Sequence, residues 1–131
     1  MRFVDTSFFV ALRMRDDRNH AQAVRLWSAD RSSLLTSNHV VGETWTFSRR
    51  RLGHAVAVEF LDLVERSDRV VIEPIGPDLE SEAWAWLRRH DERSYSFVDA
   101  TSFAVMRANR LREALAFDDD FAAAGFVEVR D

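Results

Sequence analysis

Short apolar runs alternate with longer segments of helical periodicity along the whole chain, and this alternation restricts its fold more than any other feature. The apolar runs are predicted to be strands, at residues 2–5, 33–37, 69–73, 113–117 and 126–130. The segments between most of them repeat apolar residues every three or four positions and are predicted to be helices, at residues 6–14, 19–29, 38–51, 55–66, 78–90 and 97–110. Strands separated by helices pair in parallel, because a parallel pair needs a long crossover connection. The sequence therefore predicts an α/β protein with a parallel sheet.

The length and composition indicate one folded unit. A chain of 131 residues, 47% of them hydrophobic, can build one core but not two, so we expect a single domain over residues 1–131. Cysteine is absent, which excludes disulfides and thiolate metal sites. No apolar run approaches the roughly 20 residues that span a bilayer, and the short apolar stretch at the N-terminus contains Asp5. We therefore expect no membrane association, no secretion signal and a cytoplasmic location.

All 18 basic residues are arginines, and the absence of lysine excludes several kinds of acidic site. A receiver-like signalling module and a haloacid-dehalogenase-like phosphatase both need a lysine in the pocket. The phosphatase also needs Asp-x-Asp after its first strand, where this chain has Asp5-Thr6-Ser7. The net charge of −4 argues against a surface that is positive throughout, but a nuclease with a local arginine patch remains consistent with it.

Four carboxylates that lie far apart in the sequence are predicted to meet. Asp5 and Asp118 follow two predicted strands, while Glu43 and Asp99 lie in the first halves of helices. In a parallel sheet, strand ends and the helix starts that follow them lie at the same edge, where ligands bind. The four side chains are therefore candidates for one pocket.

Each carboxylate also has a structural explanation that involves no ligand. Asp5 is placed to cap the helix that follows it, and Ser96-x-x-Asp99 matches a capping box. Glu43 fits a solvated helix position, and residues 118–120 fit an acidic turn. Scatter of the four carboxylates would favour these explanations and a non-catalytic binding module.

Convergence of the carboxylates would instead indicate a metal site. Unpaired carboxylates that share a pocket repel one another, and a divalent cation removes that repulsion. Ligands that are all oxygen favour Mg²⁺ or Mn²⁺ over zinc. The four histidines show no paired spacing for a zinc site, although His39 lies near Glu43 and is a candidate for substrate contact.

Four segments in order resemble the motifs of PIN-domain nucleases, and within them the VapC-like toxins of bacterial toxin–antitoxin pairs. The segments are VDTSFFVAL, SNHVVGETWT, YSFVDATSFAVM and LAFDDDFAAAGF, and the third is the most specific. The resemblance covers nearly the whole chain. It implies a three-layer α/β/α fold with a parallel sheet of four to five strands.

The resemblance also implies roles for the acidic residues. Asp5, Glu43, Asp99 and Asp118 would be catalytic and would bind Mg²⁺ or Mn²⁺, with Asp120 as a fifth metal ligand. Asp119 fills a spacer position and is expected to be dispensable. Thr6 and Ser7 fall where the family has a hydroxyl near the site, and Thr6 is expected to be either an orienting hydrogen-bond partner or a helix cap.

The expected activity is metal-dependent hydrolysis of RNA that leaves 5′-phosphate and 3′-hydroxyl ends. In the toxin interpretation the partners are a cognate VapB-like antitoxin and a second copy in a homodimer. A housekeeping PIN nuclease in RNA processing is the alternative enzyme. Phosphate contacts are expected from arginines, with Arg13, Arg15 and Arg18 in one group and Arg49–Arg51 in another, although a solvated face explains both groups equally well.

Overall fold

A parallel sheet of five strands forms the centre of the computed structural model, which describes residues 1–29 and 31–131. The strands are β1 (Arg2–Val4), β2 (Leu34–Ser37), β3 (Val70–Glu73), β4 (Glu113–Leu115) and β5 (Val127–Glu128). Their order is β3-β2-β1-β4-β5, and every pair of neighbours is parallel. The predicted α/β class and the predicted sheet are confirmed.

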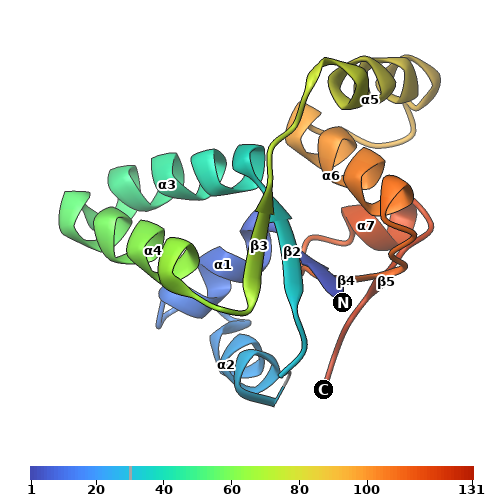
Figure 1. Cartoon of the computed structure of the whole chain (residues 1–131). Coiled ribbons are helices and arrows are strands. Elements are labelled where there is room, and N and C mark those ends of the chain that lie inside the picture. The colour runs from blue at the N-terminus through green and yellow to red at the C-terminus, as the bar shows by residue number, and fades with distance from the viewer. Residues whose placement is uncertain (30) are drawn as a thin grey trace.

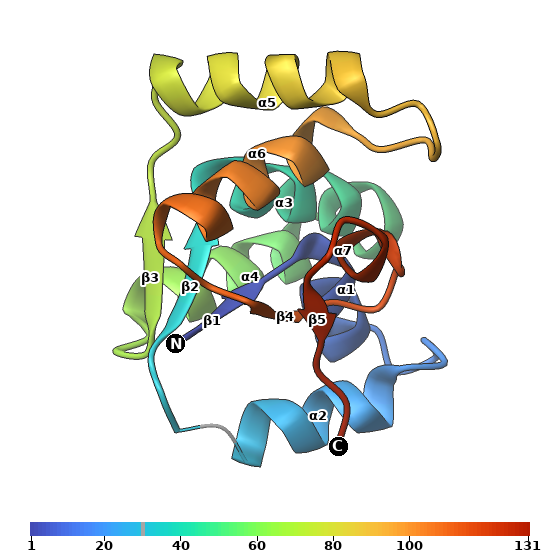
Figure 2. The ribbon, with the colours of Figure 1, turned by 90° about the vertical axis from the view of Figure 1, so that its right-hand side faces the viewer.

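Helices cover both faces of this sheet. Within the described residues they are α1 (Thr6–Arg13), α2 (His20–Ala29), α3 (Asn38–Leu52), α4 (His54–Arg66), α5 (Pro77–Arg89), α6 (Phe97–Ala108) and α7 (Asp120–Ala123). Figure 1 shows α1, α3 and α4 on one face and α6 with α7 on the other, and Figure 2 shows α5 on the outer side of α6. These layers are the three-layer α/β/α arrangement that the family resemblance implies.

The three central strands bury apolar side chains on both faces of the sheet, because helices cover both faces. Phe3, Val4, Leu34, Ala114 and Leu115 have no exposed surface. The side chain of Thr36 is also buried, and its hydroxyl donates a hydrogen bond to the Val4 carbonyl oxygen at 2.8 Å. The strand ends that carry the candidate site are therefore fixed by a well-packed core.

Helix α6 is the most deeply buried helix of the structure. All of its residues from Asp99 to Met106 are buried, between the sheet and α5. The hydroxyls of Thr101 and Ser102 each donate a hydrogen bond to the Val98 carbonyl oxygen of the same helix. Asp99 is thus the one carboxylate that this helix brings into the protein interior.

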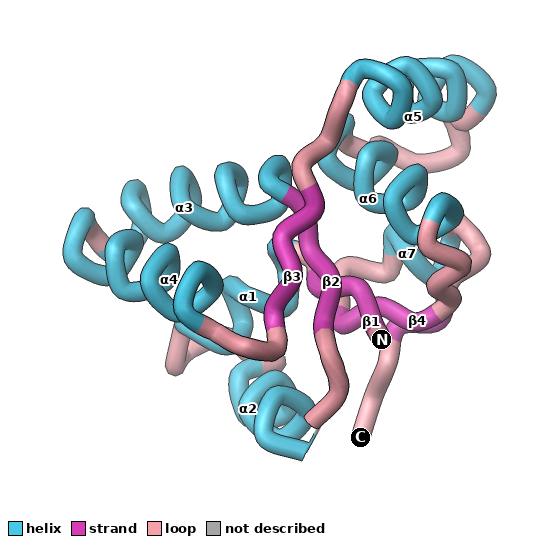
Figure 3. The backbone as a smooth tube through the Cα atoms, in the orientation of Figure 1, coloured by secondary structure: helices cyan, strands magenta, loops and turns pink. Residues whose placement is uncertain are grey.

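The remaining elements agree with the predicted ranges to within a few residues, except near the C-terminus. Figure 3 shows α3 and α4 as a hairpin, and its turn is at Gly53, the predicted helix stop, where φ is +96°. The prediction missed α7, because four residues are too few to show helical periodicity. The last strand is also shorter than predicted, since only Val127 and Glu128 pair with β4. No helix in the described part of the chain has both the length and the apolar character that crossing a membrane requires.

Candidate metal centre

The candidate site lies where the order of the sheet changes direction. From β1 the chain proceeds through β2 to β3 on one side, whereas β4 and β5 lie on the other side of β1. Asp5 directly follows β1, and Asp118 follows β4 after a short connection. Such a switch point, at the carboxyl ends of the strands, is where open parallel sheets bind ligands.

Three of the four predicted carboxylates meet at this point. Asp5, Asp99 and Asp118, which we call the carboxylate cluster, each offer an oxygen within 4.8 Å of the other two. Asp5 is 2% exposed and Asp99 is 8% exposed, while Asp118 is partly exposed. The cluster lines a hollow of about 440 Å³ that Glu43 also lines. The carboxylates are therefore not scattered, which removes the main support for a non-catalytic module.

Asp5 is held by Ser7 rather than by Thr6. The Ser7 hydroxyl donates to Asp5 Oδ2 at 2.7 Å, and the Ser7 backbone N–H donates to the same oxygen at 3.1 Å. The hydroxyl also accepts the Phe117 N–H at 3.0 Å, which joins the start of α1 to the segment after β4. Thr6 makes no hydrogen bond to Asp5 in the structure, so its orienting role stays a prediction. The Asp5-Thr6-Ser7 spacing is that of an Asx-turn and points to Ser7.

Asp99 is held by the capping box that the sequence predicts. Its Oδ2 accepts the Ser96 N–H at 2.9 Å, and the Ser96 hydroxyl accepts the Asp99 N–H at 2.9 Å. Asp5 is likewise the N-cap of α1. The capping explanations are thus correct for both residues, and they do not exclude a ligand because a carboxylate has a second oxygen and further lone pairs. Capping fixes the direction in which each carboxylate points.

Asp118 belongs to the acidic turn, residues 118–120, which other side chains hold in place. Asp118 Oδ1 accepts the Asp120 N–H at 3.2 Å, and Asp119 has a left-handed backbone with φ +67°. Glu128, whose side chain is only 4% exposed, accepts the Asp119 N–H at 3.3 Å and the Ala122 N–H at 3.1 Å. No sequence signal identifies Glu128, because its role depends on the pairing of β5 with β4.

Asp120, unlike the three residues of the cluster, forms an ion pair with an arginine among the described residues. Its Oδ1 forms an ion pair with Arg93 at 2.9 Å. Asp120 is not among the three residues that gather, although its charge acts on Asp99 and Asp118. Its assignment as a metal ligand stays a prediction, and the arrangement indicates a supporting position beside the cluster.

Burial, together with repulsion from neighbouring carboxylates, raises the pKa of every member of the cluster. Burial raises the pKa of Asp5 well above its usual range, and the charge of Asp118 raises it further. Burial also raises the pKa of Asp99, and the charges of Asp120 and Glu43 add to the effect. Burial and the charge of Asp99 raise the pKa of Asp118 to about 6. Without a cation, the site therefore holds negative charge at a cost to the folded state.

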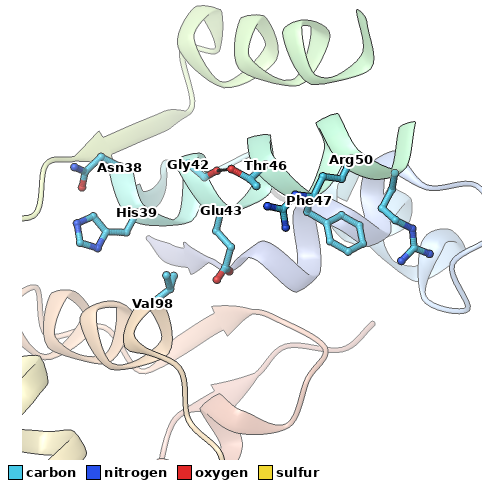
Figure 4. Close-up of a pocket in the computed structure, with 9 residues that line it drawn as sticks. Asn38, His39, Gly42, Glu43, Thr46, Phe47, Arg50 and Val98 are labelled. Carbon is cyan, nitrogen blue, oxygen red and sulfur yellow. Dashed lines mark hydrogen bonds between the residues drawn. The ribbon is translucent and has the colours of Figure 1, made fainter. Parts of the chain in front are cut away.

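Glu43 approaches the cluster from the opposite side. It lies on α3, and its side chain points into the space between α3 and α6 (Figure 4). Glu43 is exposed and does not belong to the group within 4.8 Å. The predicted pocket of four acids is thus a cluster of three, two buried and one partly exposed, with the exposed carboxylate of Glu43 beside it.

The residues present fit a hard divalent cation. The donors are all carboxylate oxygens, the ligand type that Mg²⁺ and Mn²⁺ prefer. Within the described chain, no histidine belongs to the group. Thr6 lines the same hollow, and its hydroxyl is buried without a hydrogen-bond partner among the described residues. Such a hydroxyl can bond to a water molecule or to a water bound by an ion in the hollow.

Comparisons with known proteins agree with this geometry. The profile of the PIN domain family matches residues 2–127. A Mycobacterium tuberculosis protein described as 23S rRNA-specific endonuclease VapC20 is 56% identical over 130 residues, covering 99% of this chain and 98% of the relative. The crystal structure of M. tuberculosis VapC20, described as a sarcin–ricin loop cleaving toxin, has a TM-score of 0.96 at 54% identity, with both chains fully covered.

A more distant structure shares the fold alone. A chain of a toxin–antitoxin complex from Klebsiella pneumoniae has a TM-score of 0.68 at 17% identity, over 98% of this chain and 100% of that chain. The predicted family and the predicted nuclease class are confirmed. With a family profile that spans nearly its whole length, this chain belongs to the PIN domain family, whose members are metal-dependent nucleases.

Proposed function

We propose that this protein is a Mg²⁺- or Mn²⁺-dependent endoribonuclease and the toxin of a type II toxin–antitoxin pair. The observation that carries the proposal is the carboxylate cluster, with its three oxygens within 4.8 Å at the switch point of the sheet. A relative that is 56% identical over nearly its whole length and is named as an endonuclease supports the enzyme class.

Asp5, Asp99 and Asp118 would hold the cation, and Glu43 would complete the site from α3. When bound, the cation supplies Lewis acidity, which lowers the pKa of a water molecule and neutralises charge on the phosphate. Ser7 and Ser96 fix the two buried carboxylates before substrate arrives, so little reorganisation is needed during the reaction. Glu43, exposed beside the cluster, orients the attacking water and takes its proton. Hydrolysis in this way leaves a 5′-phosphate and a 3′-hydroxyl.

The proposed substrate is the sarcin–ricin loop of 23S ribosomal RNA. The relatives whose descriptions name this activity share 54–56% of their residues with this chain and match its full length. A ribosomal substrate would place the protein in the cytoplasm. The chemistry itself does not use the 2′-hydroxyl, so selection of RNA depends on contacts outside the cluster.

The proposed partners are a VapB-like antitoxin and a second copy of the chain. An antitoxin would inhibit the enzyme most directly by placing a cationic side chain at the carboxylate cluster, where repulsion among the acids favours a positive charge. Light scattering of the purified protein measures whether the homodimer forms, and co-purification with the product of a neighbouring small gene identifies the antitoxin.

The decisive experiment is cleavage of end-labelled RNA that contains the sarcin–ricin loop, in Mg²⁺ or Mn²⁺. We expect one principal cut, which disappears with EDTA and in Asp99→Asn but persists in Asp119→Asn, the matched change at the spacer. Cleavage that survives Asp99→Asn would refute the proposed site. Efficient cutting of many RNAs, with no preference for this loop, would favour the alternative of a housekeeping nuclease.

A further inference from the structure

A second hollow, larger than the one at the carboxylate cluster, runs along α3. Its volume is about 750 Å³. Figure 4 shows the residues that line it. All but one of its lining residues belong to α3, and Val98 of α6 forms the opposite wall. We call this hollow the α3 groove. The α3 residues that line it are Asn38, His39, Gly42, Glu43, Thr46, Phe47, Arg50 and Arg51.

The main side chains of the α3 groove follow the period of the helix. His39, Glu43, Phe47 and Arg50 are separated by four, four and three positions, so they lie on one face of α3. Figure 4 shows these side chains on the same side of the helix. At a rise of about 1.5 Å per residue the row is roughly 17 Å long, a length that accommodates several nucleotides.

The α3 groove is continuous with the carboxylate cluster. Glu43 and Phe47 line both hollows, and Glu43 lies near the middle of the row. His39 stands toward one end of α3 and Arg50 toward the other (Figure 4), and Arg51 follows Arg50 in the last turn of the helix. A strand that lies in the groove therefore passes the cluster partway along its length, which is the geometry that internal cleavage of a chain requires.

The chemistry of the α3 groove suits a strand of nucleic acid. Arg50 and Arg51 line the groove and are exposed, and the Arg51 guanidinium lies 5.3 Å from the centre of the Phe47 ring. His39 lies against the Phe97 ring at 5.7 Å. Arginines bind phosphates and aromatic rings stack on bases, and single-stranded nucleic acid is bound by this combination. The adjoining acidic hollow repels phosphates, so arginines beside it have a clear electrostatic role.

We propose that the RNA substrate lies along the α3 groove, with Arg50 and Arg51 binding phosphates on one side of the scissile bond and His39 contacting the nucleotide on the other side. This inference rests on the proposed endoribonuclease function. It assigns different roles to the three consecutive arginines Arg49–Arg51. Arg49 is exposed on the same helix but does not line the groove.

The test compares Arg50→Ala and Arg51→Ala with Arg49→Ala, which removes the same charge from the same helix. Binding of a fluorescein-labelled single-stranded RNA is followed by anisotropy in Mg²⁺, with all variants in an Asp99→Asn background so that the RNA stays intact. Cleavage kinetics are measured for the same changes in the wild-type background. Circular dichroism melts verify folding, and light scattering records the mass of each variant.

We expect Arg50→Ala and Arg51→Ala each to weaken RNA binding about three- to tenfold. Each should also reduce the slope of log K against the logarithm of the salt concentration by about 0.7, the effect of one phosphate contact. In cleavage, KM rises by a similar factor while kcat stays nearly constant. Arg49→Ala should change each quantity by less than about twofold, since it removes only long-range attraction.

Three results would overturn the inference. Equal effects of all three arginine changes would mean a solvated basic face. Unchanged RNA binding together with a lower molecular mass for Arg50→Ala would assign the α3 groove to a second copy of the chain. Unchanged RNA binding with no change in mass would leave the groove without a role in substrate binding.

The inference and the proposed function fail in different ways. If the wild type does not cleave RNA but Arg50→Ala still loses RNA binding, the groove binds RNA and the enzyme proposal is wrong. If the wild type cleaves RNA and the arginine variants match Arg49→Ala, the enzyme proposal stands and the RNA path is wrong.

Discussion

Replacing Asp118 with asparagine should stabilise the metal-free protein at neutral pH. Asparagine has nearly the same shape, and its side-chain oxygen can still accept the Asp120 N–H that Asp118 accepts at 3.2 Å. The change removes a charge that the burial of the site and the neighbouring Asp99 both disfavour. A residue proposed as essential for function is thus expected to weaken the fold when no cation is present.

The size of the effect follows from the pKa of Asp118, which rises from 3.8 to about 6. One pKa unit corresponds to about 1.4 kcal/mol, so the shift gives an upper limit of about 3 kcal/mol. Because the carboxylate is partly exposed and screened by solvent, we expect about 1–2 kcal/mol. The folded state binds the proton more tightly than the unfolded state. The free energy of unfolding therefore falls as pH rises from about 4 to 6 and stays low above that range.

Urea unfolding in EDTA, at several pH values between 4 and 8, measures this effect. The wild type should lose stability as the pH rises from about 4 to 6, while Asp118→Asn should lose less and exceed the wild type at pH 7. Asp119→Asn is the matched control, because Asp119 is exposed and asparagine tolerates its left-handed backbone. Addition of Mn²⁺ should stabilise the wild type and have little effect on Asp118→Asn.

A lower stability of Asp118→Asn in EDTA at pH 7, or a pH profile identical to that of the wild type, would refute the reasoning. Either result would mean that neither burial nor the charge of Asp99 disfavours ionised Asp118 in the folded protein, and the physical argument for a cation would lose its basis.

Four further substitutions test what each residue around the cluster contributes. Ser7→Ala should lower kcat about 10- to 100-fold in RNA cleavage, because Asp5 loses the hydroxyl that orients it. Thr6→Val should leave the midpoint of urea unfolding unchanged or slightly higher, because the Thr6 hydroxyl has no hydrogen-bond partner among the described residues. Glu128→Gln should lower the free energy of unfolding in urea by about 1–2 kcal/mol, since one backbone N–H at the start of α7 loses its acceptor. An unchanged free energy of unfolding would mean that the acidic turn is stable without the Glu128 carboxylate. Glu43→Gln should abolish most cleavage while calorimetric Mn²⁺ affinity changes only a few-fold, and a complete loss of affinity would place Glu43 among the main ligands.

Prediction from sequence succeeded where one residue or one local pattern determines the structure. Asp5 lies directly after an apolar strand, and Asp99 belongs to a capping box that begins at Ser96. Local rules therefore place the Asp5 and Asp99 side chains at the edge of the sheet where the structure has them. The strand–helix alternation then predicts a parallel sheet, whose strand ends share that edge.

Prediction was weaker where tertiary structure decides the outcome. The pairing of Asp120 with Arg93 and the burial of Glu128 depend on how the C-terminal segment folds against the sheet, and no spacing in the sequence encodes them. Arg50 lines the groove and Arg49 does not, because only one side of α3 faces the site. The sequence alone does not show which side of the helix that is. These contacts link distant parts of the chain, which explains why periodicity and motifs do not detect them.

The central claim is that Asp5, Asp99 and Asp118 together bind one divalent cation. Titration of the purified protein with Mn²⁺ in a calorimeter tests it most directly, with asparagine variants of the three residues and Asp119→Asn as the control. We predict binding to the wild type and to Asp119→Asn, and a loss of at least tenfold in affinity for each cluster variant. Equal affinity in the wild type and in Asp99→Asn would contradict the account, because it would place the cation outside the cluster.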